Sequence, residues 1–130
     1  MLVLGLVCFV LMGISEAVMD TLQFHFFKSI FSNFKKQLFW DPVVSWRNKY
    51  KNGDPDQGPK FPFSTTLLVG LTDGWHFFKL LRNLFLFIGI LFLVLSLNGF
   101  WVSLLWVCIS RVLFGVSFTI FYNNVFVYSK

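Results

Sequence analysis

The chain has 130 residues, of which 56% are hydrophobic and 13% are charged, and its formal net charge is +5. A soluble domain carries about a quarter of charged residues, and one of this length could not bury so much apolar surface. The composition therefore excludes an ordinary soluble domain and predicts an all-α integral membrane protein. Most basic residues lie between the first and second apolar regions, which favours a membrane surface over nucleic acid as the partner. They are Lys28, Lys35, Lys36, Arg47, Lys49, Lys51 and Lys60.

A first helix is expected over about residues 2–37. Its first fourteen residues are almost all apolar, but about 20 are needed to cross the hydrocarbon of a bilayer. The helix must therefore include the more polar residues that follow. Glu16, Asp20 and Gln23 are spaced four and three residues apart, so they share one face of this helix.

An irregular interfacial loop is expected over about residues 38–63, because four prolines exclude a continuous helix there. Trp40, Trp46 and Tyr50 alternate with basic residues, which is typical of a loop at the level of the lipid headgroups. Cytoplasmic loops carry an excess of Lys and Arg. We therefore predict that the basic stretch 28–60 faces the cytoplasm and contacts anionic headgroups.

A second helix is expected over about residues 64–97, with Ser64 as its N-cap. A straight helix of this length would measure ~50 Å, which exceeds the thickness of the hydrocarbon. We therefore expect a kink near Arg82, and residues 64–81 could span, re-enter or lie at the interface. A third helix over about 100–121 and a polar, aromatic tail over 122–130 complete a single membrane domain with about three transmembrane helices.

Ionisable residues inside the apolar regions mark the candidate site. Asp73 and His76 are three residues apart, so on a helix they lie on one face and form a candidate catalytic acid–base pair. Arg111 lies near the middle of the third helix. An unpaired Arg there costs at least ~2.5 kcal/mol, and we expect it to pair with Glu16 or Asp20.

Several functions are compatible with a convergence of these groups at the membrane interface. The cluster could bind a lipid headgroup, a small polar ligand or a cation. Its carboxylates resemble those of metal sites in helical bundles, although the chain supplies one acid–histidine pair of the required spacing. The candidate ligand-binding residues are Glu16, Asp20, Gln23 and Arg111, and the candidate metal ligands are Glu16, Asp20, Asp73 and His76.

Other readings of the same residues remain open. The cluster could be a structural hydrogen-bonded network in which His76 bonds Thr66 or Thr72. The protein could be a non-catalytic membrane subunit that packs against a partner, or against itself, through its Phe-rich helices. A proton or ion conduit is a third possibility. The sequence contains no cofactor motif of the phosphate-loop, serine-hydrolase or zinc-protease kind, and it leaves open whether the protein is an enzyme.

Three segments resemble a group of uncharacterised small integral membrane proteins from bacteria and their phages. They are Ser15–Phe26 (SEAVMDTLQFHF), Ser45–Tyr50 (SWRNKY) and Thr72–His76 (TDGWH). The resemblance covers about the first two thirds of the chain and brings no activity with it. It implies that the three segments occur together, as expected if they meet at one membrane face.

Overall fold

The computed structural model describes residues 1–97 and 99–127, and within these residues it contains helices and no strands. Three of the helices are long and apolar enough to cross a membrane. The predicted all-α architecture with three such helices is therefore confirmed. The α-helices are α1 (Leu2–Phe24), α2 (Gln37–Trp40), α3 (Gly74–Ser96) and α4 (Phe100–Ile120).

Short helical turns make up much of the remaining chain. The 3-10 helices are η1 (Phe26–Lys28), η2 (Ile30–Asn33), η3 (Ser45–Lys49), η4 (Lys51–Gly53), η5 (Pro55–Gln57) and η6 (Val69–Leu71). A π-helix, η7 (Phe121–Phe126), follows α4 directly. The tail predicted over 122–130 is thus largely helical where it is described, and residues 128–130 lie outside the described part of the chain.

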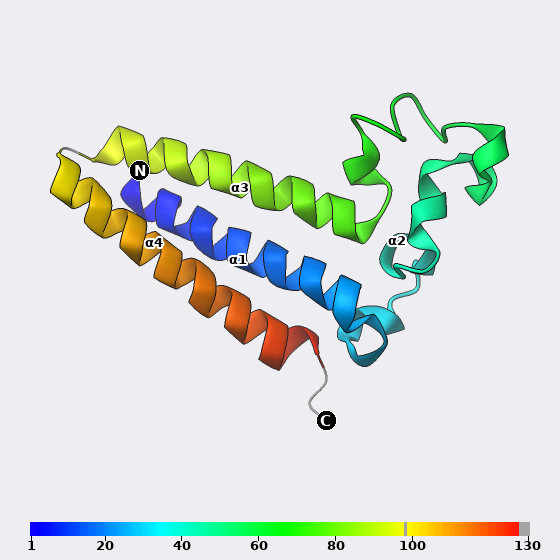
Figure 1. Ribbon diagram of the computed structural model, residues 1–130, viewed down its shortest axis with the longest axis horizontal. Coiled ribbons are helices and arrows are strands. Elements are labelled where there is room, and N and C mark those ends of the chain that lie inside the picture. The colour runs from blue at the N-terminus through cyan, green and yellow to red at the C-terminus, as the bar shows by residue number, and fades with distance from the viewer. Residues whose placement is uncertain (98, 128–130) are drawn as a thin grey trace.

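The central helix of the bundle is α1, which lies between α3 and α4 (Figure 1). It runs antiparallel to α3 and parallel to α4, so the long segment 25–73 lies at the same end of the bundle as the end of α4. In its most apolar stretch 44% of α1 is buried, against 11% for each of the other two long helices. Apolar side chains such as Phe87 (71% exposed) and Trp101 (77% exposed) face outward from α3 and α4, as expected for helices in contact with lipid.

Glycines allow α1 to approach both neighbours closely. A Cβ atom on Gly13 would lie 2.1 Å from Ser117 Oγ and 2.6 Å from the Phe114 carbonyl oxygen. On the other side, a Cβ atom on Gly5 would lie 3.3 Å from the Gly89 carbonyl oxygen. Small residues at such crossings let backbones pack against each other, which is a common way for helices to associate in membranes.

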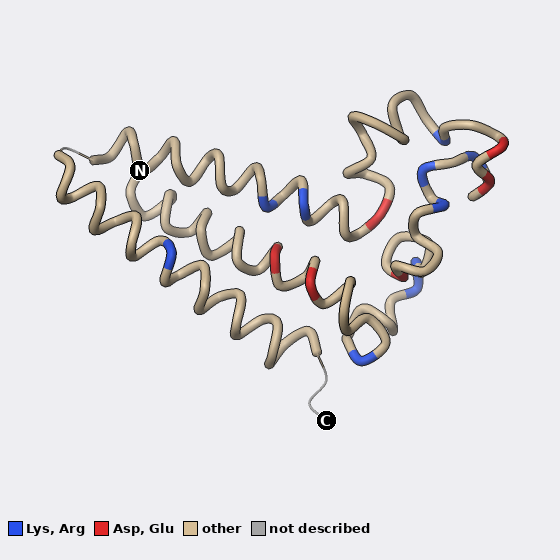
Figure 2. The backbone as a smooth tube through the Cα atoms, in the orientation of Figure 1, with Lys and Arg blue, Asp and Glu red and all other residues tan. Residues whose placement is uncertain are grey.

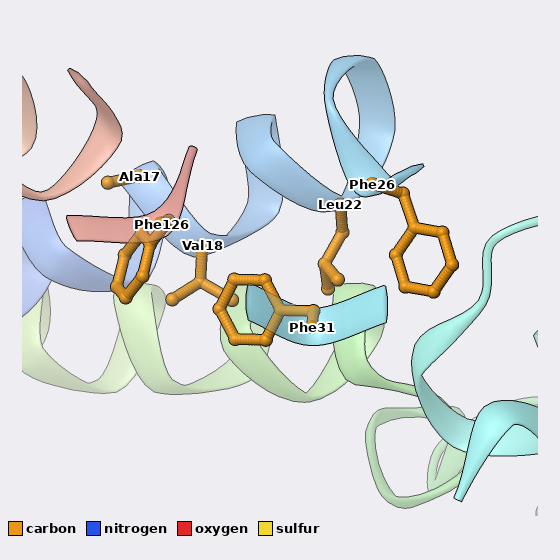
Figure 3. Close-up of a cluster of buried hydrophobic side chains, with 6 residues drawn as sticks. All are labelled: Ala17, Val18, Leu22, Phe26, Phe31 and Phe126. Atoms are coloured by element: carbon orange, nitrogen blue, oxygen red, sulfur yellow. The ribbon is translucent and has the colours of Figure 1, made fainter. Parts of the chain in front are cut away.

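The first helix ends at Phe24, so the predicted extension to residue 37 is wrong. After His25 the chain folds back in short turns that bury Phe26 and Phe31 to 4% exposure each. Figure 3 shows these rings beside Leu22 of α1 and Phe126 of η7. Burying a Phe side chain contributes about 1.5–3 kcal/mol, whereas helix propensities differ by under about 1 kcal/mol per residue. Tertiary burial therefore outweighs continuation of the helix.

The helix predicted over 64–97 begins at Gly74, so the predicted N-cap at Ser64 is wrong. The Ser64 hydroxyl is buried and donates a hydrogen bond of 2.7 Å to the Lys49 carbonyl oxygen. It is therefore used in a tertiary contact and does not cap a helix. The predicted kink at Arg82 is absent from the described helix, because α3 has only 23 residues and measures about 35 Å without bending.

Hydroxyl groups inside the bundle are satisfied within their own helices. Ser15, Ser110 and Ser117 are buried, and each donates a hydrogen bond of 2.8–2.9 Å to a carbonyl three or four residues earlier. Backbone acceptors are the partners available to a hydroxyl in an apolar helix. These residues thus pack as small side chains, which leaves the charged residues as the groups to explain.

Candidate functional site

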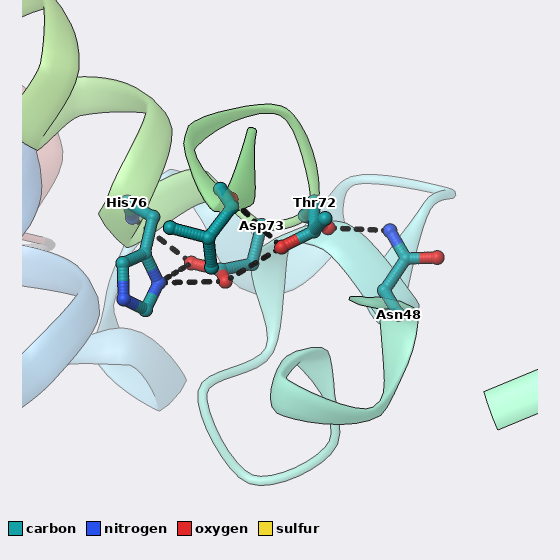
Figure 4. Close-up of polar contacts among 5 residues, drawn as sticks. Asn48, Thr72, Asp73 and His76 are labelled. Atoms are coloured by element: carbon teal, nitrogen blue, oxygen red, sulfur yellow. Dashed lines mark hydrogen bonds and ion pairs between the residues drawn. The ribbon is translucent and has the colours of Figure 1, made fainter. Parts of the chain in front are cut away.

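Asp73 and His76 come together at the first turn of α3 (Figure 4). Asp73 has extended backbone (φ −148°, ψ 161°) and is the N-cap of the helix, where its Oδ1 accepts a 2.9 Å hydrogen bond from the His76 backbone N–H. The His76 ring Nδ1 lies 2.8 Å from Asp73 Oδ2 and 3.0 Å from Oδ1. An N-cap carboxylate satisfies a free N–H at the helix start and interacts favourably with the helix dipole. The predicted pairing of these two side chains is confirmed.

A chain of hydrogen bonds holds the loop against this helix start. The Thr72 hydroxyl lies 2.8 Å from the Val69 carbonyl oxygen and 3.3 Å from Asp73 Oδ2. The Asn48 side-chain amide donates to the Thr72 carbonyl oxygen, and Lys60 Nζ donates to Asn48 Oδ1 at 2.6 Å. Residues from η3 and from the proline-rich loop are thereby fixed to the N-terminus of α3.

The two members of the pair differ in exposure. The Asp73 side chain is 4% exposed and the His76 side chain is 39% exposed. His76 faces a surface depression of about 280 Å³ that it shares with Leu68, Lys79 and Asn83. The buried carboxylate orients an imidazole whose outer edge is open, which is the geometry of a carboxylate–histidine pair. A catalytic role for these residues stays a prediction.

A separate cavity of about 220 Å³ has Asp73 among its lining residues. Gln23, predicted as a ligand-binding residue, and tryptophans from three separate segments also line it. The cavity thus joins one acid, one amide and three large aromatic rings at the loop end of the bundle. Its lining residues are Leu22, Gln23, Trp40, Pro42, Ser45, Trp46, Asp73 and Trp75.

Two of these rings already make cation–π contacts within the protein. The Arg47 guanidinium lies 5.3 Å from the centre of the Trp46 ring. The Lys79 ammonium lies 4.9 Å from the centre of the Trp75 ring. Cations within about 6 Å of an indole face are attracted by its quadrupole. Two of the tryptophans that line the cavity are therefore each paired with a cation, although neither cation lines the cavity itself.

Glu16 pairs with Arg82, across the contact between α1 and α3. Arg82 Nη1 donates to Glu16 Oε2 at 2.8 Å, and both side chains are partly buried, at 29% and 25% exposure. Figure 2 shows basic positions of α3 beside acidic positions of α1. Asp20 lies one turn further along α1 towards the loop. The depth of Arg82 in α3 matches that of Glu16 in the antiparallel α1.

Arg111 does not make the predicted ion pair in the described structure. Its guanidinium lies 5.1 Å from the centre of the Phe114 ring, and Nη1 is 3.7 Å from the Cβ position of Gly115. The side chain thus runs along α4 towards the loop end. There it lines a hollow of about 340 Å³ together with Glu16 and Asp20. Glu16 is paired with Arg82 instead of Arg111, so the predicted partner of Arg111 is wrong.

The predicted convergence of all these groups on one site is not observed. Asp73 caps the start of α3, and Arg82, which holds Glu16, is nine residues or about 13 Å further along that helix. Among the described residues no three His, Cys, Asp or Glu side chains are placed to share a metal ion. The structure instead contains two separate groups. One surrounds Asp73 at the loop end of the bundle, and the other, around Glu16, Asp20 and Arg111, lies further from that end.

The aromatic wall of the cavity is the feature that sequence reasoning missed. Trp40 and Trp46 were predicted to lie at the level of the headgroups, and no role was predicted for Trp75, which is next to His76 in the sequence. The available signal was that three of the five tryptophans lie close to the loop end of the predicted spans.

Comparisons with protein-family models, with curated proteins and with solved structures found no match for this chain.

Proposed function

We propose that this chain is an integral membrane protein that binds the ammonium-bearing headgroup of a zwitterionic phospholipid at the membrane surface. The observation that supports the proposal most is the cavity in which Asp73 lies among Trp40, Trp46 and Trp75. Groups of aromatic rings recognise ammonium ions, and Trp is the most effective of them. At about 220 Å³ the cavity is smaller than the roughly 300–1,000 Å³ pockets of drug-sized ligands, so it suits a headgroup and not a whole lipid.

The carboxylate of Asp73 gives the cavity its preference for a cation. It is 4% exposed, and in the described structure its only ionisable partner is His76. A buried carboxylate is costly unless a counter-charge and hydrogen bonds compensate it. An ammonium group in the cavity adds such a counter-charge.

The cations beside two of these rings suit the phosphate of the same headgroup. Arg47 lies over the Trp46 ring and Lys79 over the Trp75 ring. Arg in particular binds phosphate through two parallel hydrogen bonds. A zwitterionic headgroup would therefore meet an acidic residue and aromatic rings in the cavity, with basic side chains close to two of those rings.

The cavity lies at the depth that a headgroup requires. Leu22 and Gln23 belong to the last turn of α1, and Asp73 precedes the first residue of α3. These are the positions at which two apolar helices leave the hydrocarbon and enter the polar layer of a bilayer. A bound headgroup would stay in this layer while its acyl chains remain in the hydrocarbon.

We further propose that this end of the bundle faces the cytoplasm. The segment between α1 and α3 carries seven of the eleven basic residues, and short loops rich in Lys and Arg are retained on the cytoplasmic side. Each basic residue near the surface contributes about 1 kcal/mol of attraction to anionic lipids. That attraction is unselective, whereas the cavity is expected to select among headgroups.

Lipid binding to purified protein in detergent tests this proposal. Phospholipids with identical short acyl chains and choline, ethanolamine or glycerol headgroups are titrated, and binding is measured by native mass spectrometry. We expect the two ammonium-bearing lipids to bind more tightly than the glycerol lipid. Trp46→Leu should weaken their binding roughly fivefold, because a cation–π contact contributes about 1 kcal/mol.

Trp101→Leu is the matched control, because it removes the same ring at the opposite end of the bundle, where Trp101 is 77% exposed. It should leave the headgroup preference unchanged. Equal affinity for the three headgroups, or equal effects of the two tryptophan substitutions, would contradict the proposal.

A further inference from the structure

The segment 61–71, between the proline-rich loop and α3, exposes several large apolar side chains. Phe63 is 63% exposed, Leu67 82% and Leu71 52%. Thr65 and Thr66 are exposed as well, whereas Ser64 and Thr72, which follows the segment, are buried. A segment in contact with water tends to bury its large apolar side chains. The exposed Phe63, Leu67 and Leu71 therefore favour an apolar environment for this side of the segment.

The buried hydroxyls are committed to the protein. Ser64 donates to the Lys49 carbonyl oxygen at 2.7 Å, and the Thr72 hydroxyl lies 2.8 Å from the Val69 carbonyl oxygen. Ser64 and Thr72 thus anchor the segment to the rest of the protein. Turning it over to hide the leucines would break these bonds and leave buried polar groups without partners, which is costly.

The segment also lies beside helix α3 at the level of its first turns (Figure 1). A Cβ atom on Gly70 would lie 3.2 Å from Leu80 Cδ2, and Leu67 lines one depression together with Leu80 and Asn83. Leu80 and Leu84 of α3 are themselves 50% and 47% exposed. The exposed leucines of the segment therefore continue the outward-facing apolar surface of a helix that is long and apolar enough to span the membrane.

We propose that residues 61–71 lie in the interface of the bilayer, with Phe63, Leu67 and Leu71 inserted at the boundary between headgroups and acyl chains. The lipid surface is the partner that covers them. Interfacial segments of this kind bury an apolar face about 5–10 Å into the headgroup–acyl boundary. This inference is independent of headgroup binding in the Asp73 cavity, because it depends on other side chains.

Spin-label accessibility in vesicles tests the insertion directly. Single cysteines are introduced as Leu67→Cys or Leu71→Cys in a Cys8→Ala, Cys108→Ala background and labelled after reconstitution into phosphatidylcholine vesicles. Oxygen partitions into lipid, and a polar nickel chelate stays in water. We expect oxygen to relax both labels strongly and the chelate to relax them weakly. Asp56→Cys, in the exposed turn η5, is the control and should show the reverse ratio.

Two results would overturn the inference. Strong relaxation of the Leu67 and Leu71 labels by the chelate, as at Asp56, would place the segment in water. Weak relaxation by both reagents would show that protein, such as a second copy of the chain, covers the segment. Two labelled positions are used so that a local disturbance at one of them does not decide the result.

Discussion

Asp73 serves two purposes at the start of α3. It caps the helix by accepting the His76 backbone N–H at 2.9 Å, and its carboxylate forms part of the wall of the aromatic cavity. Substitutions separate these purposes, because asparagine caps a helix about as well as aspartate but carries no charge. Asp73→Asn is therefore a test of charge, and Asp73→Ala is a test of both roles.

Asp73→Ala is expected to lower the free energy of unfolding by about 1–2 kcal/mol, as for the loss of a cap. Asp73→Asn should cost much less, because the amide oxygen can still accept the His76 N–H. Unfolding of the purified protein in mixed micelles by increasing SDS measures both. Equal losses of stability in the two variants would show that the charge, and not the cap, stabilises this turn.

The ion pair between Glu16 and Arg82 is expected to couple energetically. In a double-mutant cycle with Glu16→Gln and Arg82→Gln, the coupling should be roughly 1 kcal/mol, since both side chains are only partly exposed. The same cycle with Glu16→Gln and Arg111→Gln should be close to additive, because Arg111 contacts Phe114 instead. Stronger coupling of Glu16 to Arg111 than to Arg82 would contradict the observed pairing.

At the scale of single residues, sequence spacing predicted local contacts and failed for distant ones. Asp73 and His76 are three apart and were expected on one helical face, and they do meet, but with Asp73 as the N-cap that precedes the helix. The partner of Glu16 depended on the relative level of α1 and α3, which spacing within one helix does not reveal. The cavity draws its rings from α2, η3 and α3, and no local pattern joins these segments.

At the scale of elements, the ends of the helices are set by packing more than by propensity. Helix α1 stops at Phe24 because Phe26 and Phe31 are buried in a cluster with Phe126. Helix α3 starts at Gly74 because Asp73 caps it, while Ser64 is used to hold the loop. Ser and Asp are both good N-cap residues, but only Ser64 was predicted as the cap, and its hydroxyl is used in a tertiary contact instead.

Gly13 is expected to be essential for the contact between α1 and α4. Gly13→Ala would place a methyl group 2.6 Å from the Phe114 carbonyl oxygen, a backbone atom that cannot move freely. Overpacking of this kind costs about 1–3 kcal/mol, and SDS unfolding should show the loss. Gly115→Ala is the matched control, because its nearest atom is 3.7 Å away, and it should unfold like the wild type. A Gly13→Ala variant as stable as the control would contradict the close approach.

At the scale of the whole molecule, the composition was sufficient to predict three apolar helices, but not how they pack. The central position of α1 depends on Gly5 and Gly13, which admit the backbones of α3 and α4. Their spacing of eight residues was visible, yet it did not indicate which helices would meet. The fold of residues 25–73 was beyond prediction, because it depends on contacts such as Asn48 with Thr72 across 24 residues.

The orientation in the membrane can be tested by cysteine labelling in intact cells. In a Cys8→Ala, Cys108→Ala background, Leu97→Cys lies at the C-cap of α3, and Asn52→Cys lies in η4 of the basic segment, which precedes the start of α3. A membrane-impermeant maleimide should label Leu97→Cys in intact cells and Asn52→Cys only after lysis. The opposite pattern would place the basic segment outside.

The most direct test of the proposed function is an NMR measurement of contact between headgroup and cavity. A soluble short-chain phosphatidylcholine is added to the protein in micelles, and nuclear Overhauser effects are recorded from its N-methyl protons. We predict cross-peaks to indole protons in the wild type, and their loss in Trp46→Leu but not in Trp101→Leu. N-methyl cross-peaks that are absent, or that persist unchanged in Trp46→Leu, would contradict binding of the headgroup among the tryptophans beside Asp73.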